Sequence, residues 1–580
     1  MKKNFVSIYD SCTVVYIGKN VAKDHTAMIA RTDDGSPLAA FYSLKIYPRD
    51  ALKNKLIHGV NGFSFKMPNK TYRYISTPMS PCTHKGKHWD VSTINENAVG
   101  VSATLTCHTN KNAMAADPFP KTGISEDNLA QIPGALATSA RNAMEIVAKI
   151  VDKSGMYEAT AIFATDQKET WYMEIYSGHQ YVAVKLPDDV AFTVGNEFIL
   201  ATLKDFKKNE YITSKDLFNL PKKKGFAKYQ GPHDNLHMHL SETYGVKLFD
   251  HFQSNNVHRR TWIGYRIFAP RSKEAQTYIP TKRYEPFVKP ERNDLTIHDM
   301  IKTLRNRFDG VLDNPKFKEF RRDLDLHHLR LLAAPSGLQI HAIRSYANLP
   351  KEIACQEWLA FSNSNFSPFI PLNNGVNSVS KPYSYIAPIY DYDENSPTLM
   401  FKRLNLLAHF NWKCYGDQIA KMWETYEAIY DHEYQKMIKK VKKMPLADAK
   451  AIITQYCNYV QEETFMIAKY TFNDLMMHMM NEQNIYLPNR EIPIFHPFVN
   501  LEQYVKHFNW SYHWINQKEA ILKKGKDICV IKPAECISRA KGSLTYKNKK
   551  YTIQTRIRNN QLYIAKNNID NVIKLKDIKK

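Results

Sequence analysis

The chain has 580 residues, and its content of 43% hydrophobic and 12% aromatic residues supports a sizeable core and excludes a wholly disordered protein. Its formal net charge of +23 suits a nucleic-acid partner, but no RNP, helix-turn-helix or zinc-finger pattern accompanies the charge. We therefore expect no nucleic-acid partner. No window reaches the roughly 18 uncharged apolar residues of a membrane helix, so we expect no transmembrane segment.

The N-terminal residues and the cysteines indicate a cytoplasmic protein. The start MKKNFVSIYDSC is basic but lacks the apolar stretch of about 7–15 residues that signal peptides contain. The eight cysteines include no CxxC pair and do not form the pattern of a disulfide framework. Histidines at 237–240 and 327–329 have no partners at zinc-ligand spacing. We therefore expect no metal ion and no other cofactor.

Strands and helices alternate along the first third of the chain. Apolar runs separated by turn residues predict strands at 12–18, 26–31 and 38–46 and within 95–106. Residues 126–153 have apolar residues three and four apart, as in a helix, and Pro133-Gly134 is expected to divide them into two helices. Three more strand-like runs follow, at 159–166, 170–186 and 190–200.

The rest of the chain continues this alternation. Strand candidates occur within 324–364, residues 400–480 have mostly helical spacing, and strand-like runs close the chain. The order of strands, helices, strands and helices predicts an α+β or layered α/β arrangement with mostly antiparallel sheets.

The C-terminal residues 484–580 are predicted to be a basic extension, as a small β module or as an extra edge of the main domain. From Lys518 to Lys580 the chain carries many lysines and few acids. A solvated basic face is the simpler interpretation, and contact with an anionic surface such as a membrane or a polyanion is the alternative.

One cysteine, Cys12, lies just inside the N-terminus, where the first predicted strand begins. A thiol has a pKa of about 8.5, so a cysteine nucleophile needs a base to become a thiolate near neutral pH. No histidine neighbours Cys12 in the sequence. The residue's own α-amino group, with a pKa of about 7.7–8.0, becomes available as the base if residues 1–11 are removed.

Several sequence blocks, in the same order, resemble one known family. They are CTVVYIGKNVAKDHTAMIARTDDG, INENAVGVSAT, ADPFPKTGISED, ATDQKETWYMEIYSGHQYVAVKLPDD and VGNEF. Together they resemble the C69 family of cysteine dipeptidases, the dipeptidase A group of lactic-acid bacteria. The resemblance implies an N-terminal nucleophile hydrolase with a four-layer αββα fold in residues 12–483, behind a leader of residues 1–11. It also implies hydrolysis of dipeptides with broad side-chain tolerance and without a metal.

The resemblance assigns roles to individual residues. Cys12 matches the nucleophile that becomes the mature N-terminus. Arg31 and Asp34 match an Arg-x-x-Asp pair of the wider N-terminal cysteine group, which includes penicillin V and bile-salt acylases. In those enzymes the arginine lies beside the thiolate and the aspartate binds the α-amine. The competing interpretations are a buried strand cysteine and a surface ion pair.

Two further matches lie downstream. Asn196, in VGNEF, matches a family asparagine placed as an oxyanion donor, and a turn residue is the alternative. Arg260, in NNVHRRTW, resembles the downstream arginine of the acylases, and Arg259 is the competing match. The acylases carry a second asparagine where this chain reads SATL at 102–105, so a backbone N–H is left to supply the second oxyanion donor.

These observations lead to a hypothesis and two alternatives. We expect cleavage at the Ser11–Cys12 bond, attack by the Cys12 thiolate on a dipeptide, and a thioester intermediate that water hydrolyses. One alternative is an amidase that cleaves an N-acyl bond with the same catalytic group. The other is a non-enzymatic protein on the same scaffold that binds anionic surfaces. A homo-oligomer is compatible with the sequence.

Overall fold

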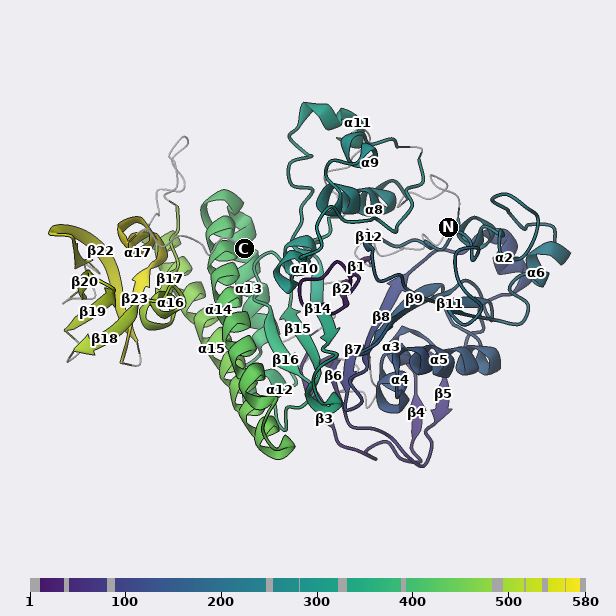
Figure 1. Ribbon diagram of the computed structural model, residues 1–580, viewed down its shortest axis with the longest axis horizontal. Coiled ribbons are helices and arrows are strands. Elements are labelled where there is room, and N and C mark those ends of the chain that lie inside the picture. Colours follow the sequence, from purple (N-terminus) through teal and green to yellow (C-terminus); the bar gives the residue numbers. More distant parts are fainter. Residues whose placement is uncertain are drawn as a thin grey trace. The chain divides into compact units, whose positions relative to one another are not determined.

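The structure is a computed structural model (Figure 1). It describes residues 11–35, 41–80, 89–246, 254–280, 282–321, 331–387, 393–481, 494–515, 518–534, 541–558 and 560–573. The predicted leader therefore lies outside the described residues, except for Ser11. The chain divides into two compact units. The first comprises Met1–Ser364, Phe369–Leu399 and Met437–Glu462, and the second comprises Asn365–Pro368, Met400–Lys436 and Glu463–Lys580.

Two antiparallel sheets form the centre of the first unit. The six-stranded sheet has the order β12 (Ala191–Val194), β1 (Ser11–Ile17), β2 (Met28–Asp34), β14 (Gly337–Ser345), β15 (Cys355–Phe361) and β16 (Ile370–Asn373). The eight-stranded sheet has the order β13 (Tyr211–Thr213), β11 (Tyr181–Lys185), β10 (Thr170–Ile175), β9 (Thr160–Thr165), β8 (Gly100–Thr106), β7 (Asp90–Asn95), β6 (Tyr74–Pro78) and β3 (Lys45–Tyr47).

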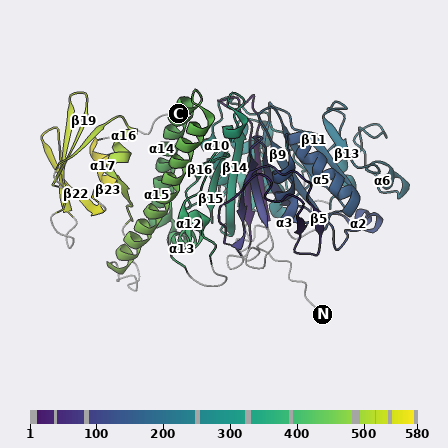
Figure 2. The ribbon, with the colours of Figure 1, turned by 90° about the horizontal axis from the view of Figure 1, so that it is seen from below.

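Helices cover the outer face of each sheet (Figure 2). The eight-stranded sheet contacts α3 (Glu126–Leu129), α4 (Gln131–Leu136) and α5 (Ala140–Ser154). The six-stranded sheet contacts α8 (Ser254–Phe268) and α10 (Ile297–Leu304). Strands β1, β2 and β14 pack on β8 and β9, so the inner faces of the two sheets meet. The predicted four-layer αββα arrangement of antiparallel sheets is confirmed.

Shorter elements connect these layers. The helices among them are α2 (Lys111–Ala116), α6 (Asn219–Lys223), α7 (Leu240–Tyr244), α9 (Lys273–Gln276), α11 (Lys318–Arg321) and α12 (Lys381–Ser384). Strands β4 (Leu56–His58) and β5 (Ser64–Lys66) form a separate antiparallel ribbon.

The helical segment 126–153 is broken at a different place from the one predicted. Pro133 and Gly134 lie inside α4, because a proline in the first turn of a helix removes an N–H that has no intrahelical acceptor there. One break, at Ala130, separates α3 from α4, and a second follows α4, where Ser139 caps α5 by accepting the N–H of Asn142. Helix α5 ends at Gly155, whose φ of 71° favours glycine.

The second unit contains a seven-stranded antiparallel sheet. Its strand order is β17 (Phe498–Asn500), β23 (Gln561–Ala565), β22 (Lys549–Arg558), β21 (Lys541–Tyr546), β20 (Asp527–Lys532), β19 (Glu519–Lys524) and β18 (Ser511–Ile515). Helices α16 (Leu501–His507) and α17 (Lys566–Ile573) contact β23. The two strands predicted around Asn559-Asn560 pair with each other as β22 and β23, although Asn559 itself lies outside the described residues.

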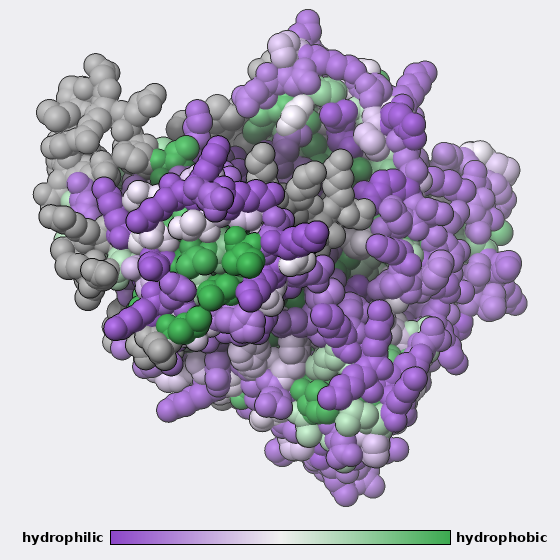
Figure 3. Space-filling model, turned by 60° about the vertical axis from the view of Figure 1, so that its left-hand side comes forward, coloured by the Kyte–Doolittle hydropathy of each residue, from purple (hydrophilic) through white to green (hydrophobic). Residues whose placement is uncertain are grey.

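The helices predicted for 400–480 are confirmed. They are α13 (Pro397–Phe410), α14 (Asp417–Val441) and α15 (Leu446–Asn481), and the boundary between the two units passes through α14 and α15. In the ranges that the structure describes, no helix combines the length and the apolar character that crossing a membrane requires. Hydrophilic side chains cover most of the face shown in Figure 3.

A buried carboxyl in β15 predicts how stability depends on pH. Glu357 is 1% exposed, and burial raises its pKa to about 7 against a weaker opposing hydrogen bond from Ser92. The native state therefore binds more protons than the unfolded state between the two pKa values, so its stability falls as pH rises through this window. We expect Glu357→Gln to gain up to about 3 kcal/mol relative to the natural chain between about pH 4 and pH 8. Urea unfolding at several pH values measures this difference.

The Glu145→Gln variant provides the control for this experiment, because the Glu145 side chain is partly exposed on α5, where it pairs with Arg141. Its stability should run parallel to that of the natural chain at every pH. If the stability of Glu357→Gln also ran parallel to that of the natural chain, the pKa of Glu357 would be the same in the folded and unfolded states.

Candidate active site

The pairing of β1 with β2 places three polar side chains on one face of the six-stranded sheet. Cys12 lies opposite Asp33, and Val14 lies opposite Arg31. Since side chains alternate along a strand, Cys12, Arg31 and Asp33 share one face. That face meets the eight-stranded sheet, because Arg31 Nη1 donates to the carbonyl of Ala103 in β8. The Cys12 thiol therefore lies between the two sheets.

Arg31 is the centre of a charged cluster. Its Nη2 atom is 3.0 Å from Cys12 Sγ, 2.8 Å from Asp33 Oδ1 and 2.8 Å from Glu126 Oε1. A guanidinium Nη carries two hydrogens, so these three acceptors compete for two donors. The guanidinium is fully buried, whereas the side chains of Asp33 and Glu126 are 11% and 15% exposed. The thiol therefore has one buried cation and two more accessible carboxylates beside it.

The charge balance around Cys12 determines how readily the thiol ionises. Burial is the largest effect and raises the pKa of the thiol to about 12. The charge of Arg31 opposes this rise, while the carboxylates of Asp33, Glu126 and Asp34 add to it. In the chain that still carries residues 1–11, the thiol is therefore protonated at neutral pH.

A second arginine holds the main chain of Cys12. Arg260, on α8, donates from Nη1 to the Cys12 carbonyl at 2.6 Å and to Thr13 Oγ1 at 2.9 Å. Its Nη2 atom donates to Asn196 Oδ1 at 2.8 Å. A Cβ atom added at Gly195 would lie 2.5 Å from the Cζ atom of Arg260, so glycine at this position leaves room for the guanidinium.

Asn196 follows β12 and faces the nitrogen of Cys12. The Cys12 N–H donates to Asn196 Oδ1 over 3.4 Å, and Asn196 Nδ2 donates to the carbonyl of Thr106 at 2.9 Å. Because Nδ2 carries two hydrogens, one remains for a substrate oxygen. A β-bulge interrupts β8 between Ala103 and Leu105, beside the carbonyl that binds Arg31. Such bulges redirect backbone groups and are frequent next to active sites.

The structure distinguishes Arg260 from its neighbour. Arg259 Nε donates to the carbonyl of Phe320 at 3.0 Å, and its guanidinium lies over the rings of Tyr278 and Phe320. Successive residues on a helix point about 100° apart, so only one of the two arginines can face β1. Arg260 is the one that contacts Cys12.

Asp34 lies on the other face of β2, opposite Ser11 in the strand register. Its Oδ2 atom accepts a hydrogen bond from Thr32 at 3.2 Å, while no described residue donates to Oδ1. Burial raises the pKa of this carboxyl to about 8, and the nearby charge of Arg260 opposes the rise. A buried carboxyl oxygen opposite Ser11 in the register therefore has no hydrogen-bond donor among the described residues.

Four of the five predicted residues form one connected cluster, and the fifth flanks it. Cys12 contacts Arg31, Asn196 and Arg260 directly, and Asp34 lies beside the cleavage position. The catalytic roles of these residues stay predictions.

Two contributors to the cluster were missed. Asp33 can be found from strand alternation, because it is two residues from Arg31 on the same strand. Glu126 comes from the start of α3, 95 residues from Arg31, and no local pattern points to it.

Glu174 supports the segment that carries Asn196. This buried carboxylate in β10 accepts the N–H of Ile199 at 2.5 Å and hydrogen bonds from the hydroxyls of Tyr172 and Tyr176. It therefore fixes the chain just after Asn196. Among the described residues, no group of three or more histidine, cysteine or acidic side chains is arranged to hold a metal ion.

Comparisons with known proteins identify the family of this chain. The family model of peptidase family C69 matches residues 11–425. The probable dipeptidase B of Streptococcus pyogenes serotype M1 is 26% identical over 457 residues, which cover 77% of this chain and 88% of that protein. The probable dipeptidase B of Lactococcus lactis subsp. lactis (strain IL1403) is 26% identical over 435 residues, covering 73% and 86%.

Among solved structures, a mutant of the conjugated bile acid hydrolase from Clostridium perfringens matches with a TM-score of 0.28 and 10% identity, over 66% of this chain and 97% of that one. A score this low adds nothing to the assignment. The family match covers well over half of the chain and begins at the strand that carries the candidate nucleophile. The chain belongs to peptidase family C69 and is a peptidase.

Proposed function

We propose that this peptidase hydrolyses dipeptides with Cys12 as its nucleophile, after removal of residues 1–11. The observation that carries the proposal is the position of Cys12, whose Sγ is 3.0 Å from Arg31 Nη2 and whose main-chain nitrogen is 3.4 Å from Asn196 Oδ1. The thiol of Cys12, the guanidinium of Arg31 and the nitrogen that would become the α-amine thus lie together at the start of β1. The names of the dipeptidase relatives support the same substrate class.

Cleavage of the Ser11–Cys12 bond would create the base. The new α-amine would have an intrinsic pKa of about 7.7–8.0, close to working pH. When protonated, it would find Asp34 Oδ1, which has no donor among the described residues. Pairing with this ammonium would lower the pKa of Asp34 from its raised value, because an opposite charge favours the carboxylate.

The catalytic cycle then needs no other base. The amine takes the thiol proton, and the thiolate, held by Arg31, attacks the peptide carbonyl to form a C–S bond. Asn196 Nδ2 and a backbone N–H of the β8 bulge bind the oxyanion, a contribution of about 3–4 kcal/mol per donor. The ammonium protonates the leaving nitrogen as the C–N bond breaks. Finally, the amine deprotonates a water that hydrolyses the thioester.

The carboxylates beside the thiol favour a dipeptide over an N-acyl amide. In a dipeptide the α-ammonium is two bonds from the attacked carbon, a separation of about 2.5 Å. Asp33 and Glu126 each lie one hydrogen bond from the Arg31 nitrogen that contacts Sγ, so they place negative charge on the side of the thiol where this ammonium would lie. An N-acyl amide carries no cation there and would face two carboxylates.

A substrate panel tests the proposed function. Dipeptides with free N-termini should be hydrolysed, whereas their N-acetylated forms and bile-salt conjugates should be hydrolysed far more slowly. Faster turnover of the N-acylated substrates would overturn the proposal and establish the amidase alternative. The breadth of side-chain tolerance, a cytoplasmic location and a homo-oligomer remain predictions.

Replacing Glu126 with glutamine should weaken recognition of the substrate ammonium. We expect KM for free dipeptides to rise about 10- to 100-fold, the size of a lost charge-assisted hydrogen bond. The slow hydrolysis of N-acetylated dipeptides should change much less, because they carry no ammonium. Steady-state kinetics on both substrate types measure the difference, with the partly exposed Glu145→Gln on α5 as control. Equal losses on both types would show that Glu126 only positions Arg31.

A further inference from the structure

Two neighbouring hairpin tips in the second unit concentrate positive charge. Strands β19 and β20 turn at Gly525, and strands β21 and β22 turn at Lys547-Asn548. Both turns lie at the same end of the sheet, because Cys529 of β20 pairs with Tyr546 of β21. We call the exposed lysines of these turns the tip lysines: Lys523, Lys524, Lys526, Lys547, Lys549 and Lys550.

The tip lysines are close enough to repel one another. The two hairpins are two strand spacings apart, about 10 Å. This is about one Debye length at physiological ionic strength, so screening removes only part of the repulsion. The described residues of the two turns include one acid, Asp527, and it already pairs with Lys547 at 3.4 Å. The cluster therefore keeps a large unbalanced positive charge.

Two structural explanations for such lysines do not apply here. Lysines often protect the edge strands of a sheet from pairing with other chains. Strands β19, β20, β21 and β22 are interior strands, and the edges of this sheet are β17 and β18. A network of ion pairs would also explain clustered charges, but a single acid cannot balance six lysines. The arrangement is better explained by an external anionic partner.

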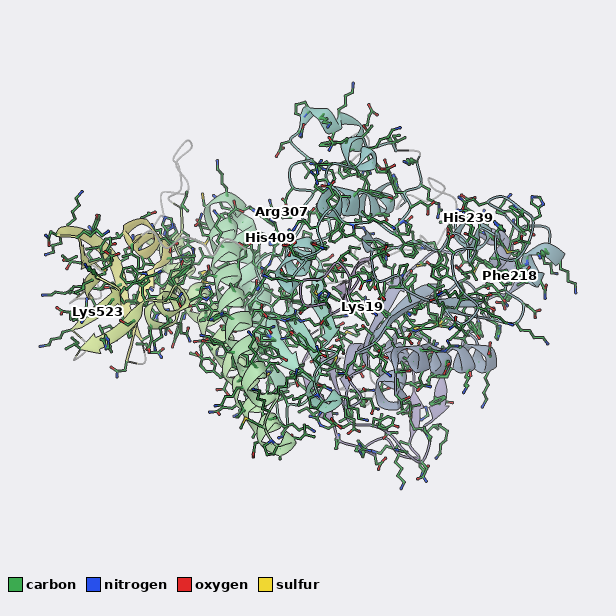
Figure 4. All side chains as sticks on the ribbon, in the orientation of Figure 1. Lys19, Phe218, His239, Arg307, His409 and Lys523 are labelled. Atoms are coloured by element: carbon green, nitrogen blue, oxygen red, sulfur yellow. The ribbon has the colours of Figure 1, made fainter. Side chains whose placement is uncertain are left out.

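The side chains around the tips indicate what kind of anionic partner fits. Ile528 is 50% exposed and lies opposite Lys523 in the strand register, as expected for a surface that meets an apolar boundary. Figure 4 labels Lys523 on this sheet. The tips contain lysine and no arginine, whereas recognition of bases relies on arginine forks and stacked aromatic rings. The aromatic ring at the tips, Tyr546, has the ammonium of Lys547 5.1 Å from its centroid.

We propose that the tip lysines bind the surface of an anionic lipid bilayer, with Ile528 entering its interfacial region. Six lysines spread over two hairpins match a planar array of headgroup charges. Lysine ammonium groups near such a surface contribute through unspecific attraction, which falls with salt. The residues that make this contact belong to the second unit, and those of the candidate active site belong to the first.

Co-sedimentation of the full chain with vesicles tests the proposal. The protein should pellet with vesicles of phosphatidylcholine and phosphatidylglycerol and stay in solution with phosphatidylcholine alone, and added salt should release it. The triple variant Lys526→Gln, Lys549→Gln and Lys550→Gln should lower the partition coefficient on the order of 10²-fold. None of these three lysines forms an ion pair with a described residue, so the fold should survive.

The matched control removes the same charge elsewhere. Lys204→Gln, Lys207→Gln and Lys208→Gln change three exposed lysines of the first unit and should leave vesicle binding within a few-fold of the natural chain. Thermal unfolding and peptidase activity of both triple variants show whether they are folded. Equal losses in the two triple variants would mean that net charge alone drives binding and would overturn the proposal. Failure of the natural chain to pellet, with retention on single-stranded DNA or polyphosphate instead, would also overturn it.

Discussion

Replacing Cys12 with alanine is expected to reduce kcat for dipeptides on the order of 10⁶-fold, the scale observed when a covalent nucleophile is removed. The reason is that the thiol forms the acyl-enzyme and lies 3.0 Å from the Arg31 cation. The described cluster holds no second thiol, and its two carboxylates, Asp33 and Glu126, are hydrogen-bonded to Arg31. Steady-state hydrolysis of a free dipeptide by the folded variant measures the loss.

A second buried cysteine serves as the control. Cys457, in α15, is also a free buried thiol, and Cys457→Ala should retain activity within a few-fold of the natural chain after correction for stability. Intact-mass analysis of Cys12→Ala adds a second reading. If cleavage is autocatalytic, residues 1–11 remain attached; if another protease acts, they are removed. Activity that survived in Cys12→Ala would place the nucleophile elsewhere.

A chain made without residues 1–11, in which the α-amine of Cys12 is free, should be active without any processing of the natural leader. A chain in which a single methionine precedes Cys12 loses that methionine to methionine aminopeptidase, because cysteine is small, and is expected to have full activity. A chain in which methionine and lysine precede Cys12 keeps both added residues and should lose about 10²–10⁴-fold, the usual contribution of general acid–base catalysis. Mass spectrometry of each N-terminus, together with dipeptide turnover, measures the comparison.

The paired design separates the missing amine from misfolding. Both chains share residues 12–17 of β1 and should unfold at similar temperatures, and the blocked chain should also lose reaction with amine-specific reagents at Cys12. Full activity in a chain shown to retain the added methionine and lysine would exclude the α-amine as the base. Arg31, Asp34 and Glu126 would then be the groups to examine for thiol activation.

The local parts of this site could be predicted from the sequence. Alternating apolar residues indicated β1 and β2, and the period of two places Cys12, Arg31 and Asp33 on one face once the strands pair. The position of Cys12 close to the start of the chain suggested its own amine as the base. Family resemblance added Asn196 and Arg260 as candidates but did not separate Arg260 from Arg259.

Long-range contacts depended on the tertiary structure. Asn196 and Arg260 reach Cys12 across 184 and 248 residues of sequence, and Glu126 reaches Arg31 across 95. The prediction placed the helix break at Pro133-Gly134, which lies inside α4. Whether a proline ends a helix depends on where that helix begins, and the sequence did not show that α4 begins two residues before Pro133. Periodicity reports which face of an element is buried and does not report which distant element covers it.

By itself the sequence determined the kinds of element and singled out a thiol with no histidine beside it in the chain, since these depend on composition and local spacing. The tertiary structure decided which groups surround Cys12. A buried guanidinium and two partly accessible carboxylates lie beside its thiol, and an asparagine faces its main-chain nitrogen. The physical reason is that the packed layers bring Arg31 of β2 against α3, and the start of β1 against Arg260 of α8 and Asn196 after β12, contacts that no local pattern encodes.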